Sequence, residues 1–193
     1  MIDLPKKRPL VLAIAGPNGA GKSTFYETQL AGFGLRFVNA DNLARQLDLD
    51  PYKAAAAADR VRRELAQMRE SFVFETVFSD PVGDKVDFLK SLEAEGFQVV
   101  LCYIGISSAE VSDQRVAMRV SKGGHDVPAG KIQERYGRTL SNLKLAIGQL
   151  GDVRVFDNDD LDYPYRLVAK CAHGRVIEFG EQVPEWLRGV LPR

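Results

Sequence analysis

The run Gly16-Pro-Asn-Gly-Ala-Gly-Lys-Ser23 constrains the fold of this chain more than any other part of its sequence. It fits the pattern G-x-x-x-x-G-K-[ST] of a phosphate-binding loop. The apolar residues 10–15 precede it, and a helix is predicted over about residues 23–30. An apolar run without alternation is typical of a strand buried on both faces of a parallel sheet. The order strand, glycine loop, helix therefore predicts an α/β fold with this loop at one end of its sheet.

The residue types of the loop indicate how it would hold phosphate groups. Glycines let the backbone curl around phosphate oxygens, and the start of a helix attracts an anion. Lys22 can neutralise the β- and γ-phosphates, and the Ser23 hydroxyl can ligate Mg²⁺. A glycine-rich turn with a purely structural use is the alternative. We expect ATP and Mg²⁺ as cofactors, held by Gly16, Asn18, Gly19, Ala20, Gly21, Lys22, Ser23 and Thr24.

Hydrophobic patterning predicts the elements that follow the loop. Strands are expected at residues 10–15, 36–40, 71–75, 98–106 and 153–156, with helical segments between them. That order predicts repeated βαβ units, and so a three-layer α/β sandwich with a mostly parallel five-stranded sheet and helices on both faces. The tail predicts a C-terminal β-hairpin over residues 165–179, turning at His173-Gly174, and a closing helix over residues 184–191.

Spacing near 3.6 residues predicts which side of each helix faces the core. The helix after Pro51 places Arg62 away from an apolar stripe formed by Ala58, Val61, Leu65 and Met68. The next helix directs inward Val82, Val86, Leu89 and Leu92. No repeat or linker is visible, so we expect residues 1–193 to form one domain. In it, residues 108–150 are a helical, lid-like region, and residues 163–193 are the hairpin and closing helix.

Charge, hydropathy and cysteines exclude several classes of protein. Lys+Arg and Asp+Glu number 26 each, and this zero net charge favours neither a nucleic-acid partner nor a membrane surface. No apolar stretch approaches the roughly 20 residues of a membrane helix, and the short run after residues 6–8 does not make a signal peptide. Cys102 and Cys171 each lie in an apolar stretch, which indicates buried reduced thiols. We therefore expect a cytoplasmic protein.

A phosphate loop serves hydrolases and transferases alike, so the ends of neighbouring strands must decide the chemistry. Residues 72–76, ending in Glu75-Thr76, and residues 153–157, ending in Asp157, only weakly resemble the strand that carries a metal-binding Asp in hydrolases. Asp41 ends the second predicted strand, where open α/β sheets bind ligands, and can accept the proton of an incoming hydroxyl. Its alternative use is a cap for a helix over residues 42–46. Arg45 could hold Asp41, reach a phosphate or face solvent.

Two pairs of arginines lie on the late helices. Arg115 and Arg119 share one helical face, as do Arg135 and Arg138, and the turn over residues 123–125 would fold the two helices together. Both pairs could then lie over the phosphates, where arginines stabilise the charge of the transferring group. The alternative is that these arginines are ordinary exposed charges on the helix surfaces. His125, in the turn, is expected to have a structural role.

Taken together, these segments resemble the zeta-toxin-like P-loop kinases. The resemblance runs from about residue 10 to residue 159 and rests, in order, on residues 16–24, Asn39-Ala-Asp41 through Arg45, Phe74-Glu75-Thr76, and Arg119 through Gly-Gly-His-Asp-Val-Pro to Arg135-Tyr136. It implies a fold like that of nucleoside and shikimate kinases. It also implies that ATP phosphorylates a hydroxyl, which in the founding toxins belongs to UDP-N-acetylglucosamine.

Transferred residue by residue, the resemblance assigns a role to each candidate. Lys22 and Ser23 become the phosphate and Mg²⁺ residues, and Asp41 becomes the general base. Arg119 and Arg135 clamp the transferring phosphoryl group, so that the catalytic set is Asp41, Lys22, Arg119 and Arg135. The substrate contacts are Arg45, Glu75, Thr76, Arg115 and Arg138. The founding toxins are longer, with added segments around the sugar-nucleotide pocket. The shorter core of this chain could therefore serve another small acceptor.

The leading hypothesis is an ATP-dependent small-molecule kinase that acts on a hydroxyl, with a UDP-N-acetyl amino sugar as the first candidate acceptor and an antitoxin protein as a possible partner. One alternative is a nucleotide-gated binding module that hydrolyses ATP and acts through a partner protein. Another is a polynucleotide-end kinase, against which the zero net charge argues.

Overall fold

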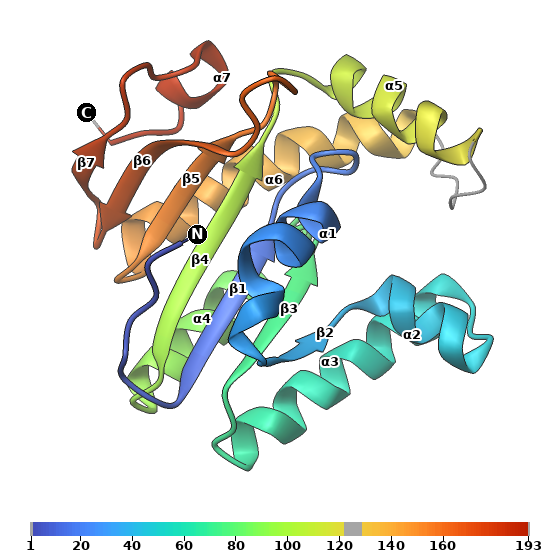
Figure 1. Ribbon diagram of the computed structural model, residues 1–193, viewed down its shortest axis with the longest axis vertical. Coiled ribbons are helices and arrows are strands. Elements are labelled where there is room, and N and C mark those ends of the chain that lie inside the picture. The colour runs from blue at the N-terminus through green and yellow to red at the C-terminus, as the bar shows by residue number, and fades with distance from the viewer. Residues whose placement is uncertain (1, 122–128, 193) are drawn as a thin grey trace.

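A single twisted sheet of seven strands forms the centre of the molecule (Figure 1). The computed structural model describes residues 2–121 and 129–192. The strands, in the spatial order β2-β3-β1-β4-β5-β6-β7, are β2 Arg36–Val38, β3 Phe72–Thr76, β1 Leu10–Ala15, β4 Gln98–Gly105, β5 Val153–Asp157, β6 Arg166–Ala172 and β7 Arg175–Phe179. Strands β1 to β5 pair in parallel, whereas β6 and β7 are antiparallel. The prediction of a mostly parallel α/β sheet is confirmed, and the C-terminal hairpin extends the same sheet.

Three of the helices begin at residues whose side chains cap them. The helices are α1 Lys22–Phe25, continued by a π-helix at Tyr26–Leu30 and a 3₁₀ turn at Ala31–Phe33, then α2 Ala40–Leu47, α3 Pro51–Gln67, α4 Asp84–Ala94, α5 Ala109–Val120, α6 Ala129–Gln149 and α7 Glu185–Arg188. Side chains of Asn39, Asp50 and Ser108 accept hydrogen bonds from the first turns of α2, α3 and α5. Such caps satisfy backbone N–H groups that have no partner within the helix.

Each face of the sheet buries its own hydrophobic cluster. On one face, strand residues such as Phe72, Leu101 and Val155 pack with α3, α4, α6 and α7. On the other face, Ile14 and Ile104 pack with Phe25 and Leu30 of the α1 segment. Figure 1 shows this arrangement, with α1 in front of the sheet and α4 and α6 behind it. Strand β1 is fully buried because it lies between β3 and β4 and is covered on both faces.

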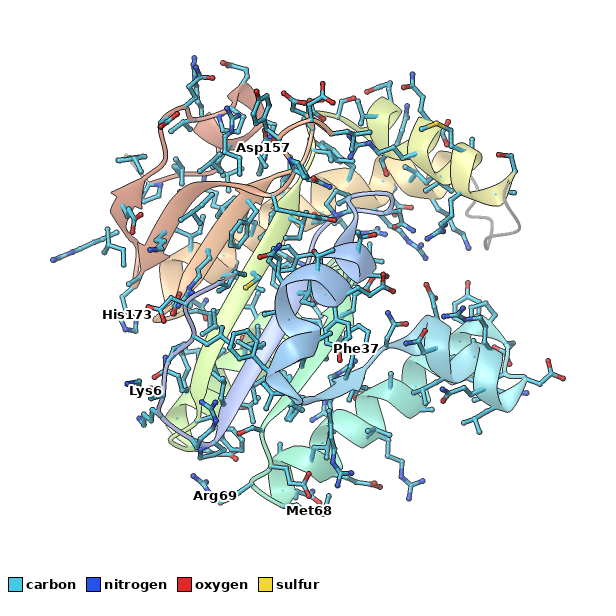
Figure 2. The ribbon with its side chains drawn as sticks, in the orientation of Figure 1. Lys6, Phe37, Met68, Arg69, Asp157 and His173 are labelled. Atoms are coloured by element: carbon cyan, nitrogen blue, oxygen red, sulfur yellow. The ribbon has the colours of Figure 1, made fainter. Side chains whose placement is uncertain are left out.

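Three expectations about helix faces were wrong. Met68 follows α3 and is 59% exposed, and Figure 2 shows it at the outer end of that helix. Val82 precedes α4 and is 71% exposed. Arg62 is buried, because its guanidinium donates to Asp59 and lies over the ring of Phe74. Met68 and Val82 lie just outside their helices, and Phe74, which covers Arg62, belongs to β3, so spacing within a helix does not predict these positions.

A partly buried cluster of charges surrounds Asp59 on α3. Its carboxylate accepts bonds from Arg62 and Arg63 and pairs with Lys85 of α4 at 3.4 Å. Burial alone would raise the pKa of Asp59, but the hydrogen bonds from Arg63 and Arg62 and the charge of Lys85 outweigh it and hold that pKa well below its usual range. The cluster therefore ties α3 to α4 in the ionised state.

Cys102 and Cys171 are free and buried, as expected, and burial raises the pKa of the Cys171 thiol to about 11. Among the helices of the described residues, none has the length and apolar character needed to cross a membrane.

Candidate active site

The glycine loop connects the end of β1 to the start of α1, as its position in the sequence predicts. Gly16 has a φ of 144°, and a Cβ at this position would lie 2.1 Å from the carbonyl oxygen of Ile104 on β4. Gly21, with a φ of 86°, caps α1, and a Cβ there would lie 2.7 Å from Nδ2 of Asn158. Side chains are excluded at both positions by space and by backbone conformation. The loop is therefore a close-fitting cradle, which suits a phosphate-binding backbone.

Side chains from three other segments hold the carbonyl groups of this loop. Ser112 of α5 donates to the carbonyl oxygen of Asn18 at 2.6 Å. Asn158, directly after β5, donates through Nδ2 to the carbonyl oxygen of Ala20 at 2.9 Å. The hydroxyl of Tyr165 donates to the carbonyl oxygen of Gly21 at 2.9 Å. Because all three bonds engage carbonyl oxygens, they stiffen the loop without using its peptide N–H groups.

Lys22 is buried at the base of the loop. Its ammonium donates to the carbonyl oxygen of Pro17 at 2.9 Å and lies 3.9 Å from Oε1 of Glu75. Burial lowers the pKa of Lys22, Glu75 and Asp41 oppose that effect, and Arg119 adds to it. The ammonium is thus a desolvated cation that interacts electrostatically with Glu75, Asp41 and Arg119. Such a cation attracts an anionic phosphate group strongly.

Glu75 ends β3 and joins two parts of the site. Its Oε2 accepts a hydrogen bond from the Ser23 hydroxyl at 2.9 Å and another from Nδ2 of Asn39 at 2.7 Å. Strand β3 lies next to β1, with Ala15 opposite Thr76, so the Glu75 side chain reaches Ser23 directly. A hydroxyl oxygen next to a carboxylate is the donor chemistry that Mg²⁺ prefers, so these residues fit that ion.

The other acidic strand end serves a different purpose. Asp157, at the end of β5, accepts bonds from Nε1 of Trp186 at 2.9 Å and from Arg166 at 3.1 Å. Figure 2 shows Asp157 close to α7, which carries that tryptophan. Asp157 therefore anchors the C-terminal segment, and Glu75 is the strand-end carboxylate beside Ser23.

Asp41 lies in the first turn of α2 and not at a strand end, because β2 ends at Val38, two residues before the predicted end of that strand. The expected alternative, Asp41 as the helix cap, is wrong, because Asn39 occupies that position and accepts from the N–H of Asn42 at 3.0 Å. Asp41 lines a cavity of about 320 Å³, here called the outer cavity, together with Ser23, Arg45 and Arg119. Arg45 donates to the side chain of Asn42. The loop, the carboxylate and an arginine therefore face one space.

Two further cavities adjoin the outer one. The loop cavity, of about 980 Å³, shares Arg119 with it and is also lined by Gly19, Gly21, Thr24, Arg115, Asn158 and Tyr165. The inner cavity, of about 290 Å³, shares Asn39, Ala40 and Asp41 with it and is also lined by Glu75, Thr76 and Arg135. A ligand at the glycine loop and a second ligand at Asp41 would therefore meet near Arg119.

The four arginines do not act as two equal pairs. Arg119 and Arg135 line the outer and inner cavities, respectively. Arg115 lines the loop cavity and donates to the carbonyl oxygens of Asn158 and Asp159 at 2.8 and 2.9 Å. Arg138 is not brought to the three cavities, because its guanidinium donates to the carbonyl oxygen of Ser79 at 2.9 Å and pairs with Glu134. The turn over residues 123–125, with His125, lies outside the described residues.

Three residues of the site were missed by motif reasoning. Asn39 precedes α2 directly after a buried valine, and a polar residue at that position is a recognisable cap signal. Asn158 follows the last parallel strand, where polar residues gather at the ligand edge of an α/β sheet. Tyr165 carries no local signal, because its role depends on the fold of the tail.

Comparison with known proteins supports a common fold and family. A family model described as Zeta toxin matches residues 52–167. An uncharacterized protein of Haemophilus influenzae is 29% identical over 126 residues, which cover 63% of this chain and 88% of that protein.

Two solved structures share the architecture. A chain from the crystal structure of AvrRxo1-ORF1:-ORF2 with ATP superposes with a TM-score of 0.69 at 22% identity, over 89% of this chain and 60% of that one. A chain from the PezAT chromosomal toxin-antitoxin system of Streptococcus pneumoniae superposes with a TM-score of 0.60 at 15% identity, over 84% of this chain and 72% of that one. This chain thus spans about three fifths of the AvrRxo1 chain that it matches.

Proposed function

The chain belongs to the zeta toxin family of P-loop kinases, and from that premise we propose that it transfers the γ-phosphoryl group of ATP to a hydroxyl of a small molecule. The observation that carries this proposal is the shared carboxylate of Glu75. One of its oxygens accepts from Ser23 of the phosphate loop and from Asn39, which caps the helix of Asp41. Glu75 thereby links the loop that would bind the triphosphate of ATP to the helix whose Asp41 carboxylate would bind the acceptor hydroxyl.

On the nucleotide side, the glycine loop and Lys22 would hold the phosphate groups of ATP, and its adenine ring would lie in the loop cavity. The burial of the Lys22 ammonium supports this role, since an ion with little water around it interacts strongly with an anion. The existence of a crystal structure with ATP for a protein of the same fold adds support. We infer that Gly16, Asn18, Gly19, Ala20, Gly21 and Thr24 line the phosphate path.

Ser23 and Glu75 would hold Mg²⁺, Ser23 directly and Glu75 either directly or through water. When bound, the ion would neutralise charge on the β- and γ-phosphates.

On the acceptor side, Asp41 would accept the proton of the hydroxyl and orient its oxygen toward the γ-phosphorus. A bond forms between this oxygen and phosphorus, the bond to the β–γ bridging oxygen breaks, and ADP leaves. Orientation supplies much of the rate in a loose transition state, so the position of Asp41 matters more than early proton removal. Arg119, which lines the outer and loop cavities, and Arg135, which lines the inner cavity, would stabilise the transferring phosphoryl group.

The acceptor that we propose first is a UDP-N-acetyl amino sugar, by analogy with the family. It would occupy the outer and inner cavities, contacting Arg45 in the outer one and Glu75 and Thr76 in the inner one. Arg115 would contact the nucleotide side, and Arg138 has no part in this scheme. An antitoxin is a natural partner to propose, because the neighbours of the same fold include a toxin-antitoxin system. We place the reaction in the cytoplasm, where ATP is available.

Incubation with γ-labelled ATP and Mg²⁺ tests the proposal, with UDP-N-acetylglucosamine, a 5′-hydroxyl oligonucleotide or buffer alone in separate reactions. Label is expected on the sugar nucleotide. Label found only as free phosphate would instead support a nucleotide-gated hydrolase, and label on the oligonucleotide an end kinase.

Two variants assign the roles within the site. Lys22→Ala should lose ATP binding and transfer together. Asp41→Ala should lose transfer while ATP binding measured by calorimetry stays nearly intact. Asp84→Ala is the matched control, because Asp84 is also an exposed acid in the first turn of a helix, α4. A fully active Asp41→Ala protein would refute the assignment of Asp41.

A further inference from the structure

We propose that Asn39 is a positioning residue that couples the phosphate loop to helix α2, so that ligand binding at Ser23 and Glu75 fixes the helix carrying Asp41. This inference rests on the proposed function, because it concerns the alignment of Asp41 with the bound nucleotide. It assigns to Asn39 a role in the reaction without contact with the reacting atoms.

The side chain of Asn39 uses both ends of its amide. Its Oδ1 accepts from the N–H of Asn42 at 3.0 Å, and its Nδ2 donates to Oε2 of Glu75 at 2.7 Å. The residue is only 6% exposed, so water competes little for either bond. The side-chain amide of Asn offers a donor and an acceptor on one planar group, and Asn is also among the best helix caps. Asp or Ser would keep the cap and lose the amide donor.

Helix α2 lies at the surface, where a tie to the sheet adds to the contacts that hold it. None of its residues is buried, although Ala40 and Leu43 pack against the core and the helix contacts the neighbouring α3. An element with few buried contacts opens locally at small free-energy cost. Its first turn is fastened to the sheet through the bond from Asn39 to Glu75.

The other oxygen contacts of Glu75 belong to the phosphate loop. Ser23 donates to the same Oε2 at 2.9 Å, and the Lys22 ammonium lies 3.9 Å from Oε1. Ligand that fixes Ser23 and Glu75 must therefore also restrict Asn39, and through the cap it restricts the first turn of α2. The carboxylate of Asp41 would be held most firmly when nucleotide is bound. This favours transfer of the phosphoryl group over opening of the site before the reaction.

Three variants separate the two bonds of Asn39. Asn39→Ser keeps an oxygen that caps α2 but is too short to keep the donor to Glu75. Asn39→Ala loses both bonds. Asp50→Ala is the matched control, since Asp50 caps α3 by accepting from Tyr52 and Lys53 and does not bond to Glu75.

The readout is hydrogen exchange of the amides of residues 43–47, measured with and without Mg²⁺ and the β,γ-imido analogue of ATP. In the unaltered protein the analogue should slow this exchange at least about fivefold, because it fixes a helix that otherwise opens locally. The response should fall below about twofold in Asn39→Ser and Asn39→Ala but persist in Asp50→Ala. With an acceptor, kcat of Asn39→Ser should fall about 10- to 100-fold while KM for ATP stays within about threefold, as for loss of one hydrogen bond to a charged group.

A response of Asn39→Ser equal to that of the unaltered protein would overturn the coupling, as would the lack of any response in the unaltered protein. Melting temperature alone does not decide, because Asp50→Ala should lower it as Asn39→Ala does. Protection of α2 by the analogue, without phosphorylation of any acceptor, would refute the proposed function and leave the coupling standing.

Discussion

Replacement of Asn158 by Ala tests whether the segment after β5 shapes the phosphate loop. Asn158 is 4% exposed, its Nδ2 donates to the carbonyl oxygen of Ala20 at 2.9 Å, and its Oδ1 accepts from the N–H of Tyr165 at 3.2 Å. Each buried group left without a partner costs about 1–3 kcal/mol, so the loss of both bonds should lower the free energy of unfolding by about 2–6 kcal/mol. For a chain of this size the melting temperature should then fall by about 4–24 °C.

The loop should also hold ATP less tightly in Asn158→Ala. Loss of one bond that supports the loop, worth about 1–1.5 kcal/mol, corresponds to a roughly tenfold rise in the Kd of ATP. Asn142→Ala is the matched control, because Asn142 is 7% exposed and donates to the carbonyl oxygens of Phe78 and Asp80 at 3.0 and 2.9 Å, away from the loop.

Thermal unfolding and calorimetry with Mg²⁺ and ATP measure the two effects. Both variants should lose similar stability, and only Asn158→Ala should lose affinity for ATP. Equal ATP affinities in the two variants would refute the argument that Asn158 shapes the binding loop.

Three further changes give independent tests. Gly16→Ala should destabilise the protein by more than about 2 kcal/mol and remove ATP binding, since the added Cβ would lie 2.1 Å from the carbonyl oxygen of Ile104; unfolding at the unaltered temperature would contradict this. Asp59 has a lowered pKa, so its contribution to stability is present at neutral pH and is lost as the pH falls below about 4. Between about pH 7 and pH 3, the free energy of unfolding measured in urea should therefore fall less in Asp59→Asn than in the unaltered protein. An equal fall in both proteins would contradict this reasoning. Trp186→Phe removes the donor to Oδ1 of buried Asp157 and should cost about 1–3 kcal/mol in a urea titration, whereas an unchanged midpoint would exclude that bond as a stabilising contact.

The architecture was predictable because its signals are local. An apolar run ending in a glycine loop specifies a buried parallel strand, and apolar strands alternating with helical periods specify βαβ units. Even the hairpin around His173-Gly174 was predicted from its turn. That β6 and β7 extend the main sheet was not predicted, because antiparallel pairing with β5 is a tertiary choice.

The site was only partly predictable for a related reason. Lys22, at the end of the loop that follows β1, and Glu75, at the end of β3, lie close together because neighbouring parallel strands share an edge. Asn158 and Tyr165 reach the loop across more than a hundred residues of sequence, and Arg138 turns away toward Ser79. Side-chain partners of this kind depend on packing, which spacing within one helix does not encode.

The loop is made early in translation, but two of its supports are made late. A nascent chain that contains residues 1–150 has the entire glycine motif and lacks both Asn158 and Tyr165. Because a domain acquires its final packing only when its later segments are present, the loop can take up its supported shape only after Asn158 and Tyr165 have been made. During synthesis the glycine motif therefore waits for the last parallel strand and the hairpin behind it before its carbonyl groups are held in place.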